Sequence, residues 1–258
     1  MTNASEYRLQ LGRMKNWIPY LLKNSGLPGP RGNLELAQVT ADMGTKFEFE
    51  QFLSFTDTAD ENTPLVFLVF CGILGLGKLA ALGEHGLLFR LRSYASDPRW
   101  RIREAVATAL QYVGDKDMQL LLDEMQIWGD GNWYEKRAAA AALAEPRLLK
   151  EPVTVRKVLK IFNLVTQEVV TAGHPNDESF KVLRQGLGYC WSVAVAALPE
   201  AGKPAMEKWL SSKNPDIQWI MRENFKKNRL IKMDPAWVTA GQAKLKKTQR
   251  TAKVKSAG

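Results

Sequence analysis

The sequence contains only two cysteines and two histidines in 258 residues, which leaves little material for a disulfide framework or a metal centre. Cys71 and Cys190 lie among apolar residues and far apart, so we expect two buried thiols in a cytoplasmic protein. His85 and His174 are not near a cysteine in sequence, which argues against a structural zinc or haem site. The sequence therefore predicts no metal and no cofactor.

Long hydrophobic runs are also missing. The segment from Met1 to Met14 carries charges and no apolar run, so we expect no secretory signal. The longest apolar run, Leu65 to Leu76, is too short to cross a bilayer and predicts a buried helix and no membrane partner. No convincing pair of strands and no G-x-S-x-G motif is present.

One glycine-rich stretch needs a choice between two interpretations. Gly72 to Lys78 matches G-x-x-x-x-G-K, the pattern of a phosphate-binding loop. Leu79 stands where such a loop has a magnesium-binding Ser or Thr, and no parallel-sheet pattern follows. Small residues on a packed helix therefore explain the stretch better.

The net charge of +9 is unevenly distributed. From Thr239 onward there are six lysines and arginines and no acid, which leaves +3 for the rest of the chain. This composition predicts a disordered basic tail over residues 239–258 that aids solubility. The alternative role for the tail is sequence-independent attraction to nucleic acid.

A repeated pattern organises the chain. Residues 97–110 read Asp-Pro-Arg-Trp-Arg-Ile-Arg-Glu and then a series of small apolar residues, and a similar pattern returns over residues 132–143. Arg103 and Arg137 lie 34 residues apart, the length of two helices with their turns. A further copy of Trp-x-x-Arg-Glu begins at Trp219. The pattern predicts an all-α fold, a right-handed α-solenoid of about five to six helix pairs over residues 1–238.

The repeat over residues 97–143 resembles a HEAT repeat, which places Asp at the turn and Arg near the start of the second helix. The resemblance implies that the Arg hydrogen-bonds turn carbonyls and an acid of the neighbouring repeat. It therefore assigns structural roles to Asp97, Arg103 and Arg222. The whole chain is similar to a group of bacterial HEAT-repeat proteins, for which fold implies little about function.

A more distant likeness is to the HEAT-like alkylpurine DNA glycosylases, which use aromatic residues, an Arg and a carboxylate. The nearest equivalents here are Trp100, Glu104, Arg137 and Trp191. Glu104 beside Trp100 could stabilise a cationic sugar while aromatic rings hold the base. The family's carboxylate is normally an Asp in a Trp-Asp segment, which this chain lacks. Trp219 and Glu223 repeat the same spacing, which favours a scaffold role for both pairs.

Basic and aromatic residues on the second helices form the predicted binding groove. The groove residues are Arg99, Arg101, Trp133, Lys136, Arg137, Arg184, Trp219, Lys226, Lys227 and Arg229. The first hypothesis is a non-enzymatic scaffold that binds a protein or other macromolecule on its concave face. The alternative is a DNA-binding repair protein of the alkylpurine glycosylase type.

Overall fold

Every regular element of the described chain is helical. The computed structural model describes the backbone of residues 3–256 and the side chains of residues 3–248. Over that range it contains fifteen α-helices, one 3-10 turn and no strand, which confirms the all-α prediction. The helices divide into two compact units, residues 1–117 and 118–258, and each is described by itself below. The single domain over residues 1–238 stays a prediction.

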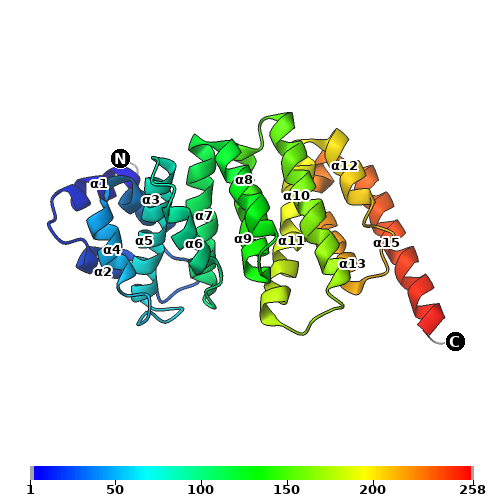
Figure 1. Ribbon diagram of the computed structural model, residues 1–258, viewed down its shortest axis with the longest axis horizontal. Coiled ribbons are helices and arrows are strands. Elements are labelled where there is room, and N and C mark those ends of the chain that lie inside the picture. Colours follow the sequence, from blue (N-terminus) through cyan, green and yellow to red (C-terminus); the bar gives the residue numbers. More distant parts are fainter. Residues whose placement is uncertain (1–2, 257–258) are drawn as a thin grey trace. The chain divides into compact units, whose positions relative to one another are not determined.

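Unit 1 is built around one apolar helix (Figure 1). Its helices are α1 (Asn3–Gly12), α2 (Ile18–Asn24), α3 (Leu34–Met43), α4 (Lys46–Leu53), α5 (Pro64–Ala81), α6 (Leu87–Ala95) and α7 (Trp100–Lys116). Helix α5 begins at Pro64, where the missing N–H costs no hydrogen bond. It is apolar on nearly all sides and contacts α2, α3, α4, α6 and α7. The buried helix predicted from residues 65–76 is therefore the centre of unit 1.

The glycines of α5 bring its neighbours close. A Cβ on Gly75 would lie 2.3 Å from the Phe49 ring, and one on Gly77 would lie 2.5 Å from Cα of Ala109. Small residues at these positions let α4 and α7 approach the backbone of α5. Lys78, the last residue of the G-x-x-x-x-G-K match, pairs with Asp42 at 2.7 Å. The stretch is thus part of a packed helix, as the sequence indicated.

Helix α5 meets the length and composition criteria for a bilayer-spanning helix, and 72% of it is buried in the protein. No other helix of residues 3–256 meets those criteria. A buried core helix meets them too. Cys71 lies on α5 and is a free thiol with no exposed surface, and burial raises its pKa. Cys190 is also a buried thiol, as predicted.

Unit 2 is built around α11. Its elements are α8 (Met118–Gly129), α9 (Trp133–Leu143), the 3-10 turn η1 (Pro146–Leu148), α10 (Pro152–Thr171), α11 (Glu178–Ala197), α12 (Pro199–Glu207), α13 (Pro215–Phe225), α14 (Asn228–Met233) and α15 (Pro235–Ser256). Successive helices pair as α8 with α9, α10 with α11 and α14 with α15. Helices α8, α10 and α12 contact in one layer, and α9, α11, α13 and α15 contact in a second layer (Figure 1).

Helix α15 corrects the prediction of a disordered tail from Thr239. Val238 and Leu245 are buried, and a Cβ on Gly241 would lie 2.3 Å from the Phe225 ring. These three positions recur at helical spacing and pack α15 against α13. Lys244, Lys246 and Lys247 had indicated a solvated end, although lysine is compatible with the outer face of a packed helix. Ala257 and Gly258 of the predicted tail lie outside the described residues.

Three helices, α7, α9 and α13, share a contact at their start. In each helix the fourth residue has a polar side chain that hydrogen-bonds to the turn before the helix. Arg103 Nη1 donates to the carbonyls of Asp97 at 2.8 Å and Pro98 at 2.6 Å. Lys136 Nζ donates to the Gly131 carbonyl, and Gln218 Nε2 donates to that of Ser212 at 3.0 Å. These contacts satisfy turn carbonyls that would otherwise be unpaired. We call Arg103, Lys136 and Gln218 the turn clasps.

In two of the three repeats, the turn clasp is a different residue from the arginine that the sequence pattern predicted. The residue equivalent to Arg103 on α9 is Lys136, one position before Arg137. On α13 it is Gln218, because Trp219 is the fifth residue of its helix whereas Trp100 is the first of α7. Arg222, to which the HEAT-repeat resemblance assigned the clasp role, lies one helical turn further along. The Trp-x-x-Arg-Glu match is therefore shifted relative to the helix starts.

This register makes a prediction for stability. Arg103→Ala should lower the free energy of unfolding by about 1–3 kcal/mol and Gln218→Ala by about 1 kcal/mol, because part-buried carbonyls lose their donors. Arg222→Ala should cost less than about 0.5 kcal/mol. Urea titrations of the three variants test this order, and a larger loss for Arg222→Ala than for Gln218→Ala would contradict the assigned register.

Candidate functional site

The net positive charge of the protein lies in unit 2. Residues 1–117 contain 13 lysines and arginines and 13 acids, so the net charge of +9 lies in residues 118–258. Charge of one sign concentrated in one unit attracts anionic macromolecules and speeds their encounter with it. The places where the cations of unit 2 gather are therefore the candidate binding sites.

One gathering place lies between helices α13 and α14. A hollow of about 450 Å³ is lined by Lys226, Lys227, Asn228, Arg229 and Lys232. Four of these five residues are cations and none is an acid. They come together because α13 ends at Phe225 and α14 starts three residues later, which brings the end of one helix beside the next. We call this feature the basic hollow.

Tyr189 of α11 adds an aromatic ring to the basic hollow. The Arg229 guanidinium donates to the Tyr189 hydroxyl at 2.5 Å and lies 4.7 Å from the ring centroid. Lys227 Nζ lies 5.6 Å from the same centroid. Tyr189 is 44% exposed, so part of its side chain is accessible to a partner. Of the nearby acids, Glu223 pairs with Lys226 at 2.5 Å.

A second acid near α14 does not neutralise the basic hollow. Asp234 pairs with Lys203 of α12 at 2.5 Å, and the hydrogen bond from Lys203 lowers the pKa of the Asp234 carboxyl. The carboxylate is thus committed to another cation. Lys232, two residues earlier, keeps an exposed side chain on the hollow.

A buried carboxylate holds the next cation of the same layer. Asp216, in the first turn of α13, has no exposed surface. It accepts a hydrogen bond from Arg184 Nη1 at 2.8 Å and pairs with Nδ1 of His174. The Arg184 guanidinium lies 4.6 Å from the Trp219 ring centroid, and its buried Nε has no hydrogen bond to any described residue. Arg184 is therefore fixed in place between α11 and α13 rather than free to follow a ligand.

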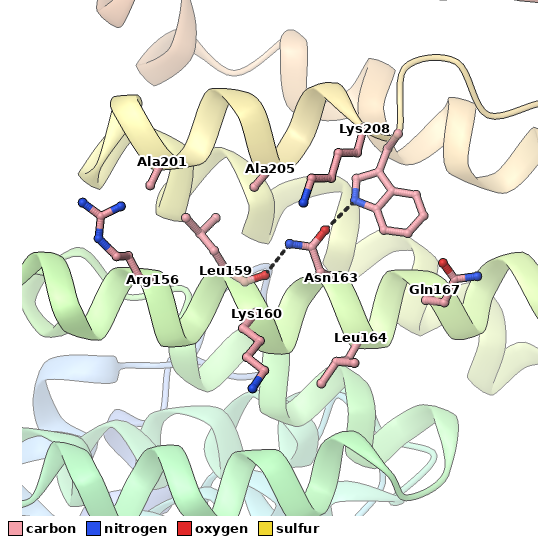
Figure 2. Close-up of a pocket in the computed structure, with 10 residues that line it drawn as sticks. Arg156, Leu159, Lys160, Asn163, Leu164, Gln167, Ala201, Ala205 and Lys208 are labelled. Atoms are coloured by element: carbon pink, nitrogen blue, oxygen red, sulfur yellow. Dashed lines mark hydrogen bonds between the residues drawn. The ribbon is translucent and has the colours of Figure 1, made fainter.

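A wider groove lies between α10 and α12, with a volume of about 730 Å³ (Figure 2). Arg156, Lys160 and Lys208 supply its charge, and no acid lines it. Figure 2 shows Ala201 and Ala205 of α12 facing α10, where small side chains leave room between the helices. Trp209 also lines the groove, and its Nε1 donates to Asn163 Oδ1 at 3.0 Å.

The structure places two of the predicted groove arginines in unit 1, where they hold loops. Arg99 binds Asp97 and donates from Nη1 to the carbonyls of Thr56 and Ala59, both at 2.7 Å. Its hydrogen bonds to Asp97 raise the Arg99 pKa. Arg101 donates to the carbonyls of Gly29 and Glu61. Through these contacts the two arginines attach the 56–61 loop to the start of α7.

The other predicted groove residues lie in unit 2. Trp133 packs edge-on against Phe180 with ring centroids 5.4 Å apart. Lys136 is buried and paired with Glu168 at 2.9 Å. Arg137 lies against Gly186 of α11, where an added Cβ would be 3.2 Å from its Cγ. The structure thus brings Lys226, Lys227 and Arg229 together in the basic hollow, where Lys226 also pairs with Glu223. Lys136 and Arg184 lie outside the hollow and pair with acids of other helices.

The four residues of the glycosylase-like alternative belong to different environments. Trp100 and Glu104 line one cavity of unit 1. Trp191 of unit 2 has no exposed surface, packs against Phe162 and donates from Nε1 to Thr166 at 3.0 Å. Arg137 is also in unit 2. In this arrangement Trp191 serves the core of unit 2.

Sequence reasoning missed Tyr189 and the α10–α12 groove. A signal for the groove was present, because Arg156, Lys160, Asn163 and Gln167 recur every three to four residues and form a polar stripe on α10. The opposite stripe of α10 supplied the apolar pattern that predicted the helix. Tyr189 gave no signal, since it lies within the apolar second half of α11.

No group of three or more His, Cys, Asp and Glu side chains suited to a metal ion is found among residues 3–256. Comparison with protein-family models, with curated proteins and with solved structures gives no match. The functional argument therefore rests on the geometry and charge of the two units.

Proposed function

We propose that the protein is a non-enzymatic, HEAT-like helical-repeat scaffold, and that unit 2 binds a macromolecular partner. The repeat part of the proposal is supported by the pairing of successive helices, their contacts in two layers and the recurring turn clasps. The right-handed α-solenoid predicted from the sequence remains part of this proposal. The basic hollow carries the binding part, because four cations surround it and no acid lines it.

Nucleic acid is the partner class that this surface favours. Phosphate backbones are bound chiefly by lysine and arginine, and exposed aromatic rings add stacking with the bases of single strands. The basic hollow offers both, since Tyr189 lies beside Lys227 and Arg229. The net charge of unit 2 would add attraction over longer distances. We therefore propose DNA binding without a repair reaction.

A protein partner is the second candidate, and the α10–α12 groove favours it. Leu159, Leu164, Ala201 and Ala205 give that groove an apolar lining next to its three cations. Mixed apolar and cationic surfaces suit an acidic peptide or helix better than a phosphate backbone.

The mutational test compares two sets of lysine and arginine residues in unit 2. Replacing Lys226, Lys227, Arg229 and Lys232 with alanine should weaken binding to a mixed-sequence 20-base-pair DNA duplex at least tenfold, because about four phosphate contacts are lost. Fluorescence anisotropy at fixed salt measures the affinity. The matched control replaces Lys150, Lys157, Lys181 and Lys213, which removes the same charge outside both cation-lined features.

The control should change the affinity by about twofold, since only the long-range attraction is reduced. Equal losses in both variants would show that net charge alone drives binding and would overturn the role of the basic hollow. Absence of DNA binding by the unmodified protein would leave the protein-partner candidate.

A further inference from the structure

The cavity of unit 1 that Trp100 and Glu104 line has a volume of about 380 Å³ and takes no part in the binding proposed for unit 2. The loop before α3, the start of α5 and the outer side of α7 enclose it. Val66, Phe67 and Phe70 form an apolar wall from α5. Trp100, Glu104 and Thr108 recur every four residues along α7 and form the opposite wall. Its volume lies within the range of small-molecule sites and gives room for about a dozen water-sized groups.

Arg101 gives this cavity a charged group with an unused donor. Its side chain is 9% exposed. Nε donates to the Glu61 carbonyl at 3.1 Å, and Nη2 donates to the Gly29 carbonyl at 2.9 Å and to Asn62 Oδ1 at 3.2 Å. Nη1 makes no hydrogen bond to any residue that the structure describes. A nearly buried guanidinium with one unsatisfied nitrogen is a fixed donor site for an anion.

The other charged groups of the cavity favour an anion over a cation. The Arg101 guanidinium lies 4.4 Å from the Trp100 ring centroid, which fixes its plane at the cavity wall. Arg31 of the neighbouring loop also lines the cavity and is exposed. Glu104, the one acid in the lining, already has an interaction within the protein. Glu61 pairs with Arg101 Nε at 3.6 Å and does not line the cavity, so the two cations of the lining, Arg101 and Arg31, outnumber its one acid.

We infer that this cavity binds a small amphipathic carboxylate. Its apolar body would lie against Phe67, Phe70 and the exposed ring of Trp100, and its carboxylate would accept from Arg101. A single carboxylate fits better than a phosphate, because one guanidinium nitrogen is unused and the wall from α5 offers no donor side chain. Leu34, which is 57% exposed at the rim, would be covered by the apolar body. This inference is independent of DNA binding by unit 2.

The test uses isothermal titration calorimetry of the full chain with dodecanoate, and with dodecanol as a neutral probe of the same length. Dodecanoate should bind at one site and at least tenfold more tightly than dodecanol, because only the carboxylate can accept from Arg101. Thr108→Phe should abolish binding by filling the cavity, and Thr171→Phe, an exposed position of unit 2, should leave it unchanged. Arg31→Gln should weaken dodecanoate binding severalfold and leave dodecanol unaffected.

Arg101→Gln is the most direct charge variant, but Arg101 also holds two loops. Thr108→Phe and Arg31→Gln therefore carry the test if Arg101→Gln does not fold. No dodecanoate binding, equal affinity for dodecanoate and dodecanol, or unchanged binding in Thr108→Phe would each overturn the inference. DNA binding by the same Thr108→Phe protein distinguishes failure of this site from failure of the proposed function.

Discussion

Gly77→Ala is expected to lower the free energy of unfolding by about 2–3 kcal/mol, although alanine is the better helix former. An alanine Cβ at this position would lie 2.5 Å from both Cα and Cβ of Ala109 and 2.7 Å from its carbonyl oxygen. Backbone atoms cannot rotate away as a flexible side chain can, so α5 and α7 must separate. Overpacking of this kind typically costs about 1–3 kcal/mol, and separation exposes further apolar surface of the most extensive helix contact in unit 1.

Gly86→Ala is the matched control for this prediction. Nothing lies within 4 Å of a Cβ added at Gly86, and its φ of −57° suits any residue. The control should leave stability unchanged or raise it by about 0.5 kcal/mol through the unfolded state. Equal melting curves for both variants in thermal denaturation would mean that the close approach of α5 and α7 is absent in solution.

Asp216→Ala is expected to cost about 3 kcal/mol of unfolding free energy. The carboxylate has no exposed surface and is paired with Arg184 and His174. Removing one member of a buried ion pair leaves the other charge uncompensated and typically costs about 3–5 kcal/mol. We expect the lower end of this energy range because the Arg184 side chain is 26% exposed and can be partly hydrated. The helix dipole of α13 also loses an acid from its first turn.

The control for Asp216 is Asp123→Ala on α8. Asp123 is exposed and accepts a hydrogen bond from Gln119 at 2.7 Å. Its replacement should change the unfolding free energy by less than about 0.5 kcal/mol. Guanidinium chloride titrations measure both variants, and a loss below about 1 kcal/mol for Asp216→Ala would show that the buried pair is not formed.

The elements that sequence predicted well are those with a strong apolar pattern. Helix α5 was predictable because Leu65 to Leu76 is apolar on every side, and α10 because its apolar residues recur at helical spacing. Such patterns indicate that apolar side chains become buried, and this burial is the main source of stability for a helix in a folded unit. Helix α15 was missed because its buried face has few residues, Val238, Gly241 and Leu245, among many lysines.

The repeat register could not be fixed from residue identity. Clasping a turn requires a long side chain with a donor, and Arg103, Lys136 and Gln218 all meet that requirement with different residues. A search for a recurring arginine therefore selected Arg137 and Arg222, one and four positions away. What the repeats share is a donor at one helix position.

The candidate site was predictable only in part. Lys226, Lys227 and Arg229 stand together in sequence and also line the basic hollow. Lys136 and Arg184 have the same residue types, yet Glu168 and Asp216 pair with them across helices. Pairing with a distant acid depends on tertiary contacts, which composition does not reveal. The groove predicted from the positions of lysines and arginines in the sequence was therefore larger than the basic hollow.

The central claim is that unit 2 binds a polyanion through the basic hollow. The salt dependence of DNA affinity is its most direct test. Binding of the full chain to a 20-base-pair duplex should weaken about 100-fold between 50 and 200 mM NaCl, as expected for about four phosphate contacts. The quadruple alanine variant of the basic hollow should show a much flatter slope. No measurable binding at 50 mM NaCl, or binding that does not change with salt, would contradict the claim.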